Sequence, residues 1–367
     1  MKDRNGSTIT SKQMIFIIVG SQVGIRLMYM PRVLTAIARQ DAWIAVLIAS
    51  IVPIISLFLI DRLGKRMPEM GFARMSQELF GKFLGSILII IFIGYVIGYM
   101  SIIMRFFSEV TKLYLLPKTP LAVILLMYVF MVVYVANKGA RVIGRLNDLL
   151  FYLILATFLL LIIPAGQGDY TYLLPIGEAG LGGIARGFVT AGYYYAGIEV
   201  LLVYYSLVNK KDEIFKAGLI AIAITTAFYV SIIVICELVF GISGLQKHLF
   251  PGLILLKIVQ IPVFERLEFI FLFFWLGIGA RPAINMCFAA SLAFTQLLKL
   301  DEKKYLIYPL ILIAVSIFIL ALLPSDILVV FNLRTFAGYG FYLIGIIYPL
   351  LFLIMSFIHE EKVKQNA

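Results

Sequence analysis

Two apolar stretches decide the fold: residues 14–26 read MIFIIVGSQVGIR, and residues 188–199 read FVTAGYYYAGIE. Both are hydrophobic enough to enter a membrane, and glycines interrupt both. A helix broken at membrane depth leaves backbone N–H and C=O groups unbonded, which is costly unless they are buried in protein or line a wet cavity. The breaks around Gly24 and Gly197 therefore predict a binding site within the membrane.

A single sequence offset relates the two stretches. Adding 173 residues carries the first glycine break onto the second, and it also carries Arg26 onto Glu199. This offset indicates a repeat whose halves cover roughly residues 12–163 and 185–358.

The remainder of the chain has the composition of a multi-pass membrane protein. Of its 367 residues, 62% are hydrophobic and 14% charged, and the mean hydropathy is +1.02; soluble chains carry about 25% charged residues. Apolar runs of membrane-spanning length predict ten helices, near residues 13–36, 42–60, 83–107, 119–136, 142–163, 187–208, 214–241, 265–298, 304–323 and 336–358.

Ten helices in two halves give five spans per half. An odd number reverses the direction of the second half, which is the inverted-repeat arrangement of secondary transporters. We therefore expect an all-α membrane protein, a single transmembrane domain over residues 1–367, with a 5+5 inverted repeat and with helices one and six broken.

The net charge of +11 is a topology signal. If both termini are cytoplasmic, nineteen of the 31 Lys and Arg residues fall on inner segments and ten, including Arg105 and Arg334, on outer ones. This excess agrees with the positive-inside rule, so the basic balance needs no nucleic-acid partner. The two remaining residues, Arg26 and Arg281, fall inside predicted spans.

The broken helices suggest how a zwitterionic amino acid would bind. The half-helix after Gly24 offers N–H donors and a positive dipole end to a carboxylate. Carbonyl groups released by the first half of helix six are suitable acceptors for an ammonium. Alternatively, Gly20 and Gly24, like Gly94 and Gly98, form a small-residue motif for helix packing; we favour packing for the second pair only.

Charged residues within the spans are expensive and are usually paired or solvated by a cavity. Arg26 and Glu199 either pair with each other or find separate partners. Arg281 either occupies the place of a coupling cation, which predicts sodium independence, pairs with Glu237, or accompanies a kink at Pro282. Tyr95 and Tyr99 share a helix face and either pack in the core or line the cavity.

The chain has few of the side chains that catalytic or metal sites usually need. The chain contains two histidines and two cysteines, and both cysteines lie in apolar runs. We therefore predict no enzyme activity, no cofactor and no metal site.

Several short motifs resemble the spore germination permeases, the B subunits of endospore germinant receptors within the amino acid-polyamine-organocation (APC) superfamily. They are ITSKQ (9–13), PR (31–32), DAWI (41–44), ANKG (136–139), VIGRLN (142–147), GIEVL (197–201) and FERLE (264–268). The resemblance spans nearly the whole chain.

This resemblance implies a LeuT-like fold in the spore inner membrane, and a nutrient ligand, typically an amino acid. It also implies two partners, an A subunit with membrane helices and a lipoprotein C subunit. Together with the breaks, it gives a candidate ligand site made of Gly20, Ser21, Gln22, Val23, Gly24, Arg26, Tyr99, Gly192, Tyr193, Tyr194, Gly197, Glu199, Gly279 and Arg281.

The family often has small or hydroxyl residues where this chain has Arg26. The guanidinium either selects an acidic ligand or is neutralised by Glu199 and leaves a neutral one. Three functions remain open: a receptor subunit that senses a nutrient, an amino acid permease that is proton-coupled or sodium-independent, and a scaffold that binds no ligand.

Overall fold

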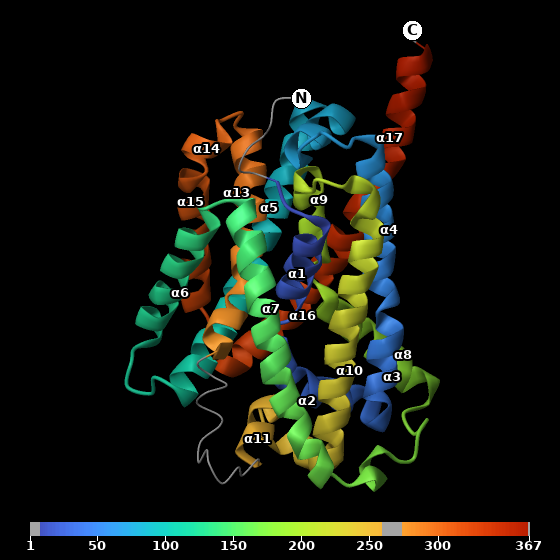
Figure 1. Ribbon diagram of the computed structural model, residues 1–367, viewed down its shortest axis with the longest axis vertical. Helices are drawn as coiled ribbons and strands as arrows, with labels where there is room; N and C mark the ends of the chain where they lie inside the picture. Colours follow the sequence, from blue (N-terminus) through green and yellow to red (C-terminus); the bar gives the residue numbers. More distant parts are fainter. Residues whose placement is uncertain (1–7, 259–273, 366–367) are drawn as a thin grey trace.

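The computed structural model describes residues 8–258 and 274–365, and this part of the chain is helical (Figure 1). Its helices are α1 (Ser11–Gln22), α2 (Arg26–Ala38), α3 (Ala42–Ala49), α4 (Ile51–Arg66), α5 (Phe72–Tyr114), α6 (Leu121–Ala136), α7 (Ala140–Ile162), α8 (Gly180–Gly192), α9 (Leu201–Tyr204), α10 (Ile214–Lys247), α11 (Pro251–Ile258), α13 (Arg281–Leu297), α14 (Glu302–Tyr305), α15 (Ile307–Leu322), α16 (Ile327–Tyr342) and α17 (Tyr348–Gln365).

The prediction of an all-helical membrane protein is confirmed. Among the described residues, six helical stretches are long and apolar enough to cross a membrane, and three shorter apolar helices accompany them. The six are Arg26–Arg66, Phe72–Tyr114, Ala140–Gln167, Lys211–Lys247, Phe274–Leu297 and Ile327–Glu360. The start of the predicted span 265–298 and the motif at 264–268 lie outside the described residues.

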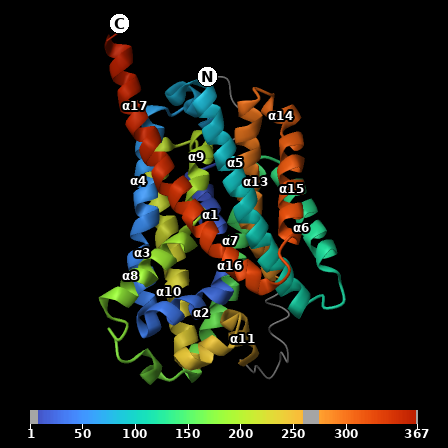
Figure 2. The same ribbon diagram turned by 180° about the vertical axis from the view of Figure 1, so that it is seen from behind.

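Helix α1 lies in the middle of the bundle (Figures 1 and 2). It packs against α7, α10 and α13, and α13 in turn packs against α5. Buried residues of α1 form a nearly continuous run from Phe16 to Gln22, so this helix has protein on all sides. A helix surrounded in this way can carry polar groups at membrane depth, because neighbouring helices supply their partners.

The start of α1 is fixed locally. Thr10 and Gln13 form a reciprocal capping box, which satisfies two donors at the helix start. The preceding residue, Ile9, bonds through its backbone to Leu207 and Asn209 at 2.9 and 3.0 Å. The beginning of α1 therefore lies beside the end of the sixth predicted span.

The first and last helices meet the same end of the molecule. In Figure 1 the N-terminal side of α1 and the C-terminal end of α17 both point upward. At this end Arg66 of α4 makes a 2.7 Å ion pair with Glu360 of α17. An even number of spans is the arrangement that this placement favours.

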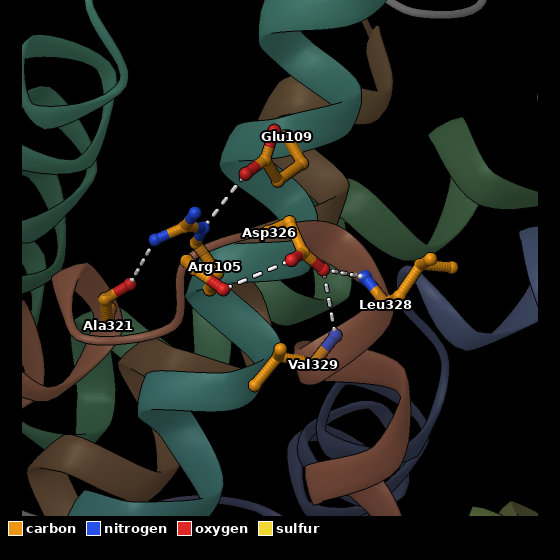
Figure 3. A network of polar contacts seen from close by, with 7 residues as sticks. Arg105, Glu109, Ala321, Asp326, Leu328 and Val329 are labelled. Carbon is orange, nitrogen blue, oxygen red and sulfur yellow. Dashed lines mark hydrogen bonds and ion pairs between the residues drawn. The ribbon is translucent and has the colours of Figure 1, made fainter.

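A polar network shapes the turn between α15 and α16 (Figure 3). Arg105 of α5 donates to Glu109 at 2.9 Å and to the Ala321 carbonyl at 2.8 Å. Asp326 caps α16 by accepting from the backbone N–H groups of Leu328 and Val329. These bonds, together with the Ser325 hydroxyl, hold the pKa of Asp326 below its usual value.

Two charges that were counted as outer lie within helices. Because α16 begins at Ile327, nine residues before the predicted span, Arg334 belongs to this helix rather than to an outer loop. Arg105 is buried within α5, at 5% exposure, and it also lay inside the predicted span 83–107. Arg334 was counted as a loop charge because hydropathy alone does not locate the start of a helix.

Pro31 lies inside α2, which continues for seven more residues to Ala38. Gly94 and Gly98 do not mark a close helix contact, because a Cβ on either would meet nothing within 4 Å among the described residues.

Gly197 makes the most demanding backbone contact. Its φ is 123°, a value that L side chains rarely adopt, and a Cβ there would lie 2.7 Å from the Ser21 carbonyl carbon and oxygen.

We expect Gly197→Ala to destabilise the protein by on the order of 1–3 kcal/mol, the usual cost of a strained backbone. Gly94→Ala is the matched control and should not lower stability, because Gly94 lies inside α5 with open space around it and alanine favours the helix. Thermal unfolding of both variants in detergent measures the difference. Equal melting temperatures for Gly197→Ala and the wild type would show that the close contact is wrong.

Candidate functional site

The first break lies between α1 and α2. Helix α1 ends at Gln22, Val23 is extended (φ −88°, ψ 115°), and α2 begins at Arg26. The amides of Leu27 and Met28 bond back to the carbonyls of Gly24 and Ile25 at 3.2 and 3.0 Å. The first turn of α2 thus uses part of the donor set that was expected to receive a carboxylate.

The second break follows α8. A 3₁₀ turn covers Tyr193–Tyr195, Ala196 is extended (φ −55°, ψ 137°), and Gly197 has a positive φ before a second 3₁₀ turn, Ile198–Val200. An α-helical hydrogen-bond ladder is therefore interrupted over these residues, which releases the carbonyl groups of residues 194–196.

The two breaks touch each other. The Gly197 backbone lies against the Ser21 carbonyl, as its Cβ position shows, and the Gln22 side chain donates to the Tyr195 carbonyl at 2.9 Å. Gln22 also accepts from Thr225 of α10 at 2.8 Å. Sequence analysis brought Ser21, Gln22 and Gly197 to one site, and they lie together here.

Arg26 joins the two broken helices directly. Its Nη1 donates to the carbonyls of Tyr194 and Ala196, the latter at 2.9 Å, and its guanidinium carbon lies 5.2 Å from the centre of the Tyr99 ring. Tyr229 of α10 donates to the Tyr194 carbonyl as well, at 2.9 Å. Protein donors thus take the carbonyl groups that were expected to accept a ligand ammonium.

Glu199 has its own partners. Its carboxylate accepts from the Tyr95 hydroxyl at 2.6 Å and from the Gly197 backbone N–H at 2.7 Å. Within the described ranges, no ion pair of 4.0 Å or less joins it to Arg26. Of the two alternatives for these charges, the structure has the one in which each finds separate partners.

Arg281 begins α13 and is fully buried. It donates to the Ile278 carbonyl at 3.1 Å and, at 3.4 Å, to the Val23 carbonyl at the first break. Its alternative partner, Glu237, is also fully buried, and neither carboxylate oxygen of Glu237 has a hydrogen-bond partner in the described part of the chain. The guanidinium therefore sits on a carbonyl of the broken helix, not on that carboxylate.

Three glycines of the predicted site serve close packing and are not themselves breaks. Gly20 lies inside α1 against the side chain of Asn147, and Gly192 ends α8 against the Tyr342 hydroxyl. Gly279 lies against the ring of Phe107, on α5. A Cβ at each of these glycines would overlap its neighbour, so the packing interpretation holds for Gly20 although the break beside it is real.

An amide network that the sequence did not single out supports the first break. Asn285 of α13 donates to the Ser21 hydroxyl at 2.9 Å and to the Ile17 carbonyl at 3.1 Å. Asn147 of α7 donates to Asn285 at 2.9 Å. Asn147 belongs to the VIGRLN motif. This motif is the only sequence signal we can identify that pointed to a residue of this network.

Four tyrosines gather around the breaks. Tyr193 and Tyr194 are stacked, with ring centres 4.5 Å apart, and Tyr95 and Tyr99 are stacked at 5.5 Å. The hydroxyl groups of Tyr99, Tyr193 and Tyr194 are buried without a partner at hydrogen-bond geometry among the described residues, and so is Nη2 of Arg26. The Tyr193 and Tyr194 hydroxyls lie close enough to interact with each other.

These atoms define what the site can do. Buried polar groups in proteins are nearly always hydrogen-bonded, and an exception calls for a ligand or water. The breaks therefore offer a guanidinium donor and phenol hydroxyls to a small polar molecule. The Tyr99 hydroxyl belongs to this group, whereas the Tyr95 hydroxyl is occupied by Glu199.

Comparison with known proteins identifies the family. A family model described as "Spore germination protein" matches residues 8–327. The chain is 28% identical to Spore germination protein YndE of Bacillus subtilis over 95% of this chain and 96% of that protein. It is 25% identical to Spore germination protein A2 of the same organism, over 94% of each chain, and 23% identical to Spore germination protein GerQB of Bacillus cereus, over 95% and 96%.

The match covers most of the chain, and the two breaks lie within the matched range. The resemblance seen in the short sequence motifs is confirmed. This multi-pass membrane protein belongs to the spore germination protein family.

Proposed function

We propose that this chain is the B subunit of an endospore germinant receptor and that it binds a small nutrient, an amino acid, between its two broken helices. The observation that carries the proposal is the set of buried, unpartnered donors at the breaks: Nη2 of Arg26 and the hydroxyls of Tyr99, Tyr193 and Tyr194. Family membership supplies the process, germination.

The proposed architecture has ten membrane spans in a LeuT-like 5+5 inverted repeat. The broken first span is α1 with α2, and the broken sixth is α8 with the turns up to α9. Gln22 and Tyr195, which hydrogen-bond to each other, are separated by 173 residues, the offset of the repeat. Equivalent residues meet in this way near a twofold axis between inverted halves, which supports the repeat over 12–163 and 185–358.

We assign both termini to the cytoplasm and the protein to the spore inner membrane. The positive-inside rule supports this orientation, and the shared end of α1 and α17 fits it (Figure 1). An A subunit and a lipoprotein C subunit are the proposed partners, because a receptor that does not transport its ligand needs other chains to read its conformation.

Ligand binding would act by a population shift. Arg26 belongs to α2 and donates to carbonyls of the second break. A ligand that bonds Arg26 therefore changes the relative stability of two arrangements, one with α2 and the second break close together and one with them apart. A ligand shifts such an equilibrium only by its differential affinity for the two states. No net transport is required for this signal.

Deletion of the gene should make spores lose their response to one nutrient while uptake of that nutrient by growing cells is unchanged. Germination across a panel of amino acids, followed by loss of optical density, measures the effect. Accumulation of labelled amino acid against a gradient by the purified protein in liposomes would favour the permease instead.

Tyr99→Phe and Tyr95→Phe form a matched pair on one helix face. Tyr99→Phe should weaken ligand binding about 3- to 10-fold with little change in stability, because its hydroxyl has no protein partner. Tyr95→Phe should lower stability by on the order of 1–3 kcal/mol, because the buried Glu199 oxygen loses its donor. Binding isotherms and thermal unfolding separate the two effects. The reverse pattern would refute this assignment.

Ligand binding should be independent of sodium. Arg281 places a fixed positive charge on the Val23 carbonyl at the first break, where a cation would compete with it. The dissociation constant measured in sodium chloride and in choline chloride should agree within about twofold, a difference of under ~0.5 kcal/mol. An affinity that rises steeply with sodium concentration would contradict this role for Arg281.

A further inference from the structure

A second arginine lies beside the tyrosines at the breaks. Arg334 is the eighth residue of α16. Its guanidinium carbon lies 5.2 Å from the centre of the Phe331 ring and 6.0 Å from the centre of the Tyr29 ring. Its Nε is buried without a hydrogen-bond acceptor among the residues described. A partly buried guanidinium donor with no acceptor is costly at membrane depth.

Arg334 and Arg26 lie against one connected group of aromatic rings. The Tyr29 ring, which Arg334 faces, lies 6.0 Å from the ring of Tyr194, and Tyr194 stacks on Tyr193. Arg26 faces the Tyr99 ring and donates to the Tyr194 carbonyl. The six residues Arg26, Tyr29, Tyr99, Tyr193, Tyr194 and Arg334 are therefore one cluster, called here the arginine–tyrosine cluster.

Helix α16 is built to approach this cluster closely. A Cβ on Gly338 would lie 2.9 Å from the ring of Tyr193, and one on Gly340 would lie 2.9 Å from the ring of Tyr95. The Tyr342 hydroxyl donates to the Val189 carbonyl of α8 at 2.8 Å. The helix that carries Arg334 thus rests with bare backbone on the aromatic side chains of the sixth and third spans.

The cluster has more donors than acceptors. Arg26 and Arg334 contribute two positive charges, and Glu199 contributes one negative charge, whose two oxygens already accept from Tyr95 and Gly197. The three carbonyls released at the second break accept from Arg26, Gln22 and Tyr229. The unused atoms are guanidinium N–H donors and phenol hydroxyls, so the complementary ligand is rich in acceptors and negatively charged.

We propose that Arg334 is a second ligand-binding residue, and that the ligand is a small dicarboxylate, such as an acidic amino acid, with one carboxylate for Arg26 and one for Arg334. A guanidinium matches a carboxylate in both charge and donor geometry. The inference rests on the proposed nutrient site and names its ligand class.

The test is binding of five probes to the full-length protein purified in detergent: glutamate, aspartate, succinate, glutamine and alanine. The wild type should bind at least one dicarboxylate about 10-fold or more tighter than glutamine or alanine. Arg334→Gln should weaken dicarboxylate binding by about 10- to 100-fold, the range for a lost charged hydrogen bond, and leave glutamine within about threefold.

Arg186→Gln is the matched control, because Arg186 is an exposed arginine on α8 whose side chain donates to its own helix. It should bind every probe like the wild type. If Arg334→Gln does not fold, Arg334→Lys replaces it; the lysine keeps the charge but loses the planar donor pair, and should weaken dicarboxylate binding about 3-fold or more.

The outcomes separate the two proposals. Preferential binding of glutamine or alanine by the wild type, unchanged in Arg334→Gln, overturns the dicarboxylate ligand and leaves the nutrient site standing. Equal loss of all five probes in Arg334→Gln also overturns it, because a ligand-class residue must change the preference. If the wild type binds none of the probes but spores still need the gene to respond to an amino acid, only the dicarboxylate inference is overturned. If the wild type binds none of the probes and spores respond to amino acids without the gene, both proposals are overturned.

Discussion

The Arg26 guanidinium is the contact on which the two broken helices depend. The residue Arg26 begins α2, and its guanidinium donates to backbone carbonyls released by the break after α8. A hydrogen bond between a charged group and a neutral partner contributes about 1.5–3 kcal/mol, and removing the guanidinium leaves buried carbonyls without their donor. The close approach of Gly197 to Ser21 keeps the second break within reach of this side chain. A larger residue at 197 would separate the breaks and leave both the charge and the carbonyls without partners.

Around this contact, polar side chains of neighbouring helices bond to the residues of the first break. Tyr229 of α10 donates to the Gln22 carbonyl, Thr225 of α10 donates to the Gln22 side chain, and Asn285 of α13 donates to the Ser21 hydroxyl. Thr225 and Tyr229 lie about one helical turn apart, so one face of α10 serves the first break. The interrupted backbone is therefore tolerated because protein, and not lipid, surrounds it.

Sequence reasoning located the breaks because glycine and charge within an apolar run are visible in one chain. Gly24, Arg26, Gly197 and Glu199 all lie at the site. The partners of these residues were not visible. Asn285 and Tyr229 stand far away in sequence, and an amide or a phenol in an apolar helix is common.

Arg334 was missed for a different reason. Hydropathy averages over a window, so a helix that starts with a capping aspartate and contains an arginine reads as a loop. Asp326 was the available signal, because aspartate before an apolar run is a typical helix start. The prediction that Gly94 and Gly98 serve helix packing was wrong, because the spacing of glycines does not reveal whether another helix lies opposite them.

The placement of Arg334 puts part of the cluster on a helix with an irregular end. Helix α16 is capped at its start by Asp326 (Figure 3) and is followed by a π-helical turn, Leu343–Ile347. Such turns are less regular than the α-helix and often occur at functional sites. A ligand that bonds Arg26 and Arg334 together links α2 to α16 and offsets the repulsion between the two charges.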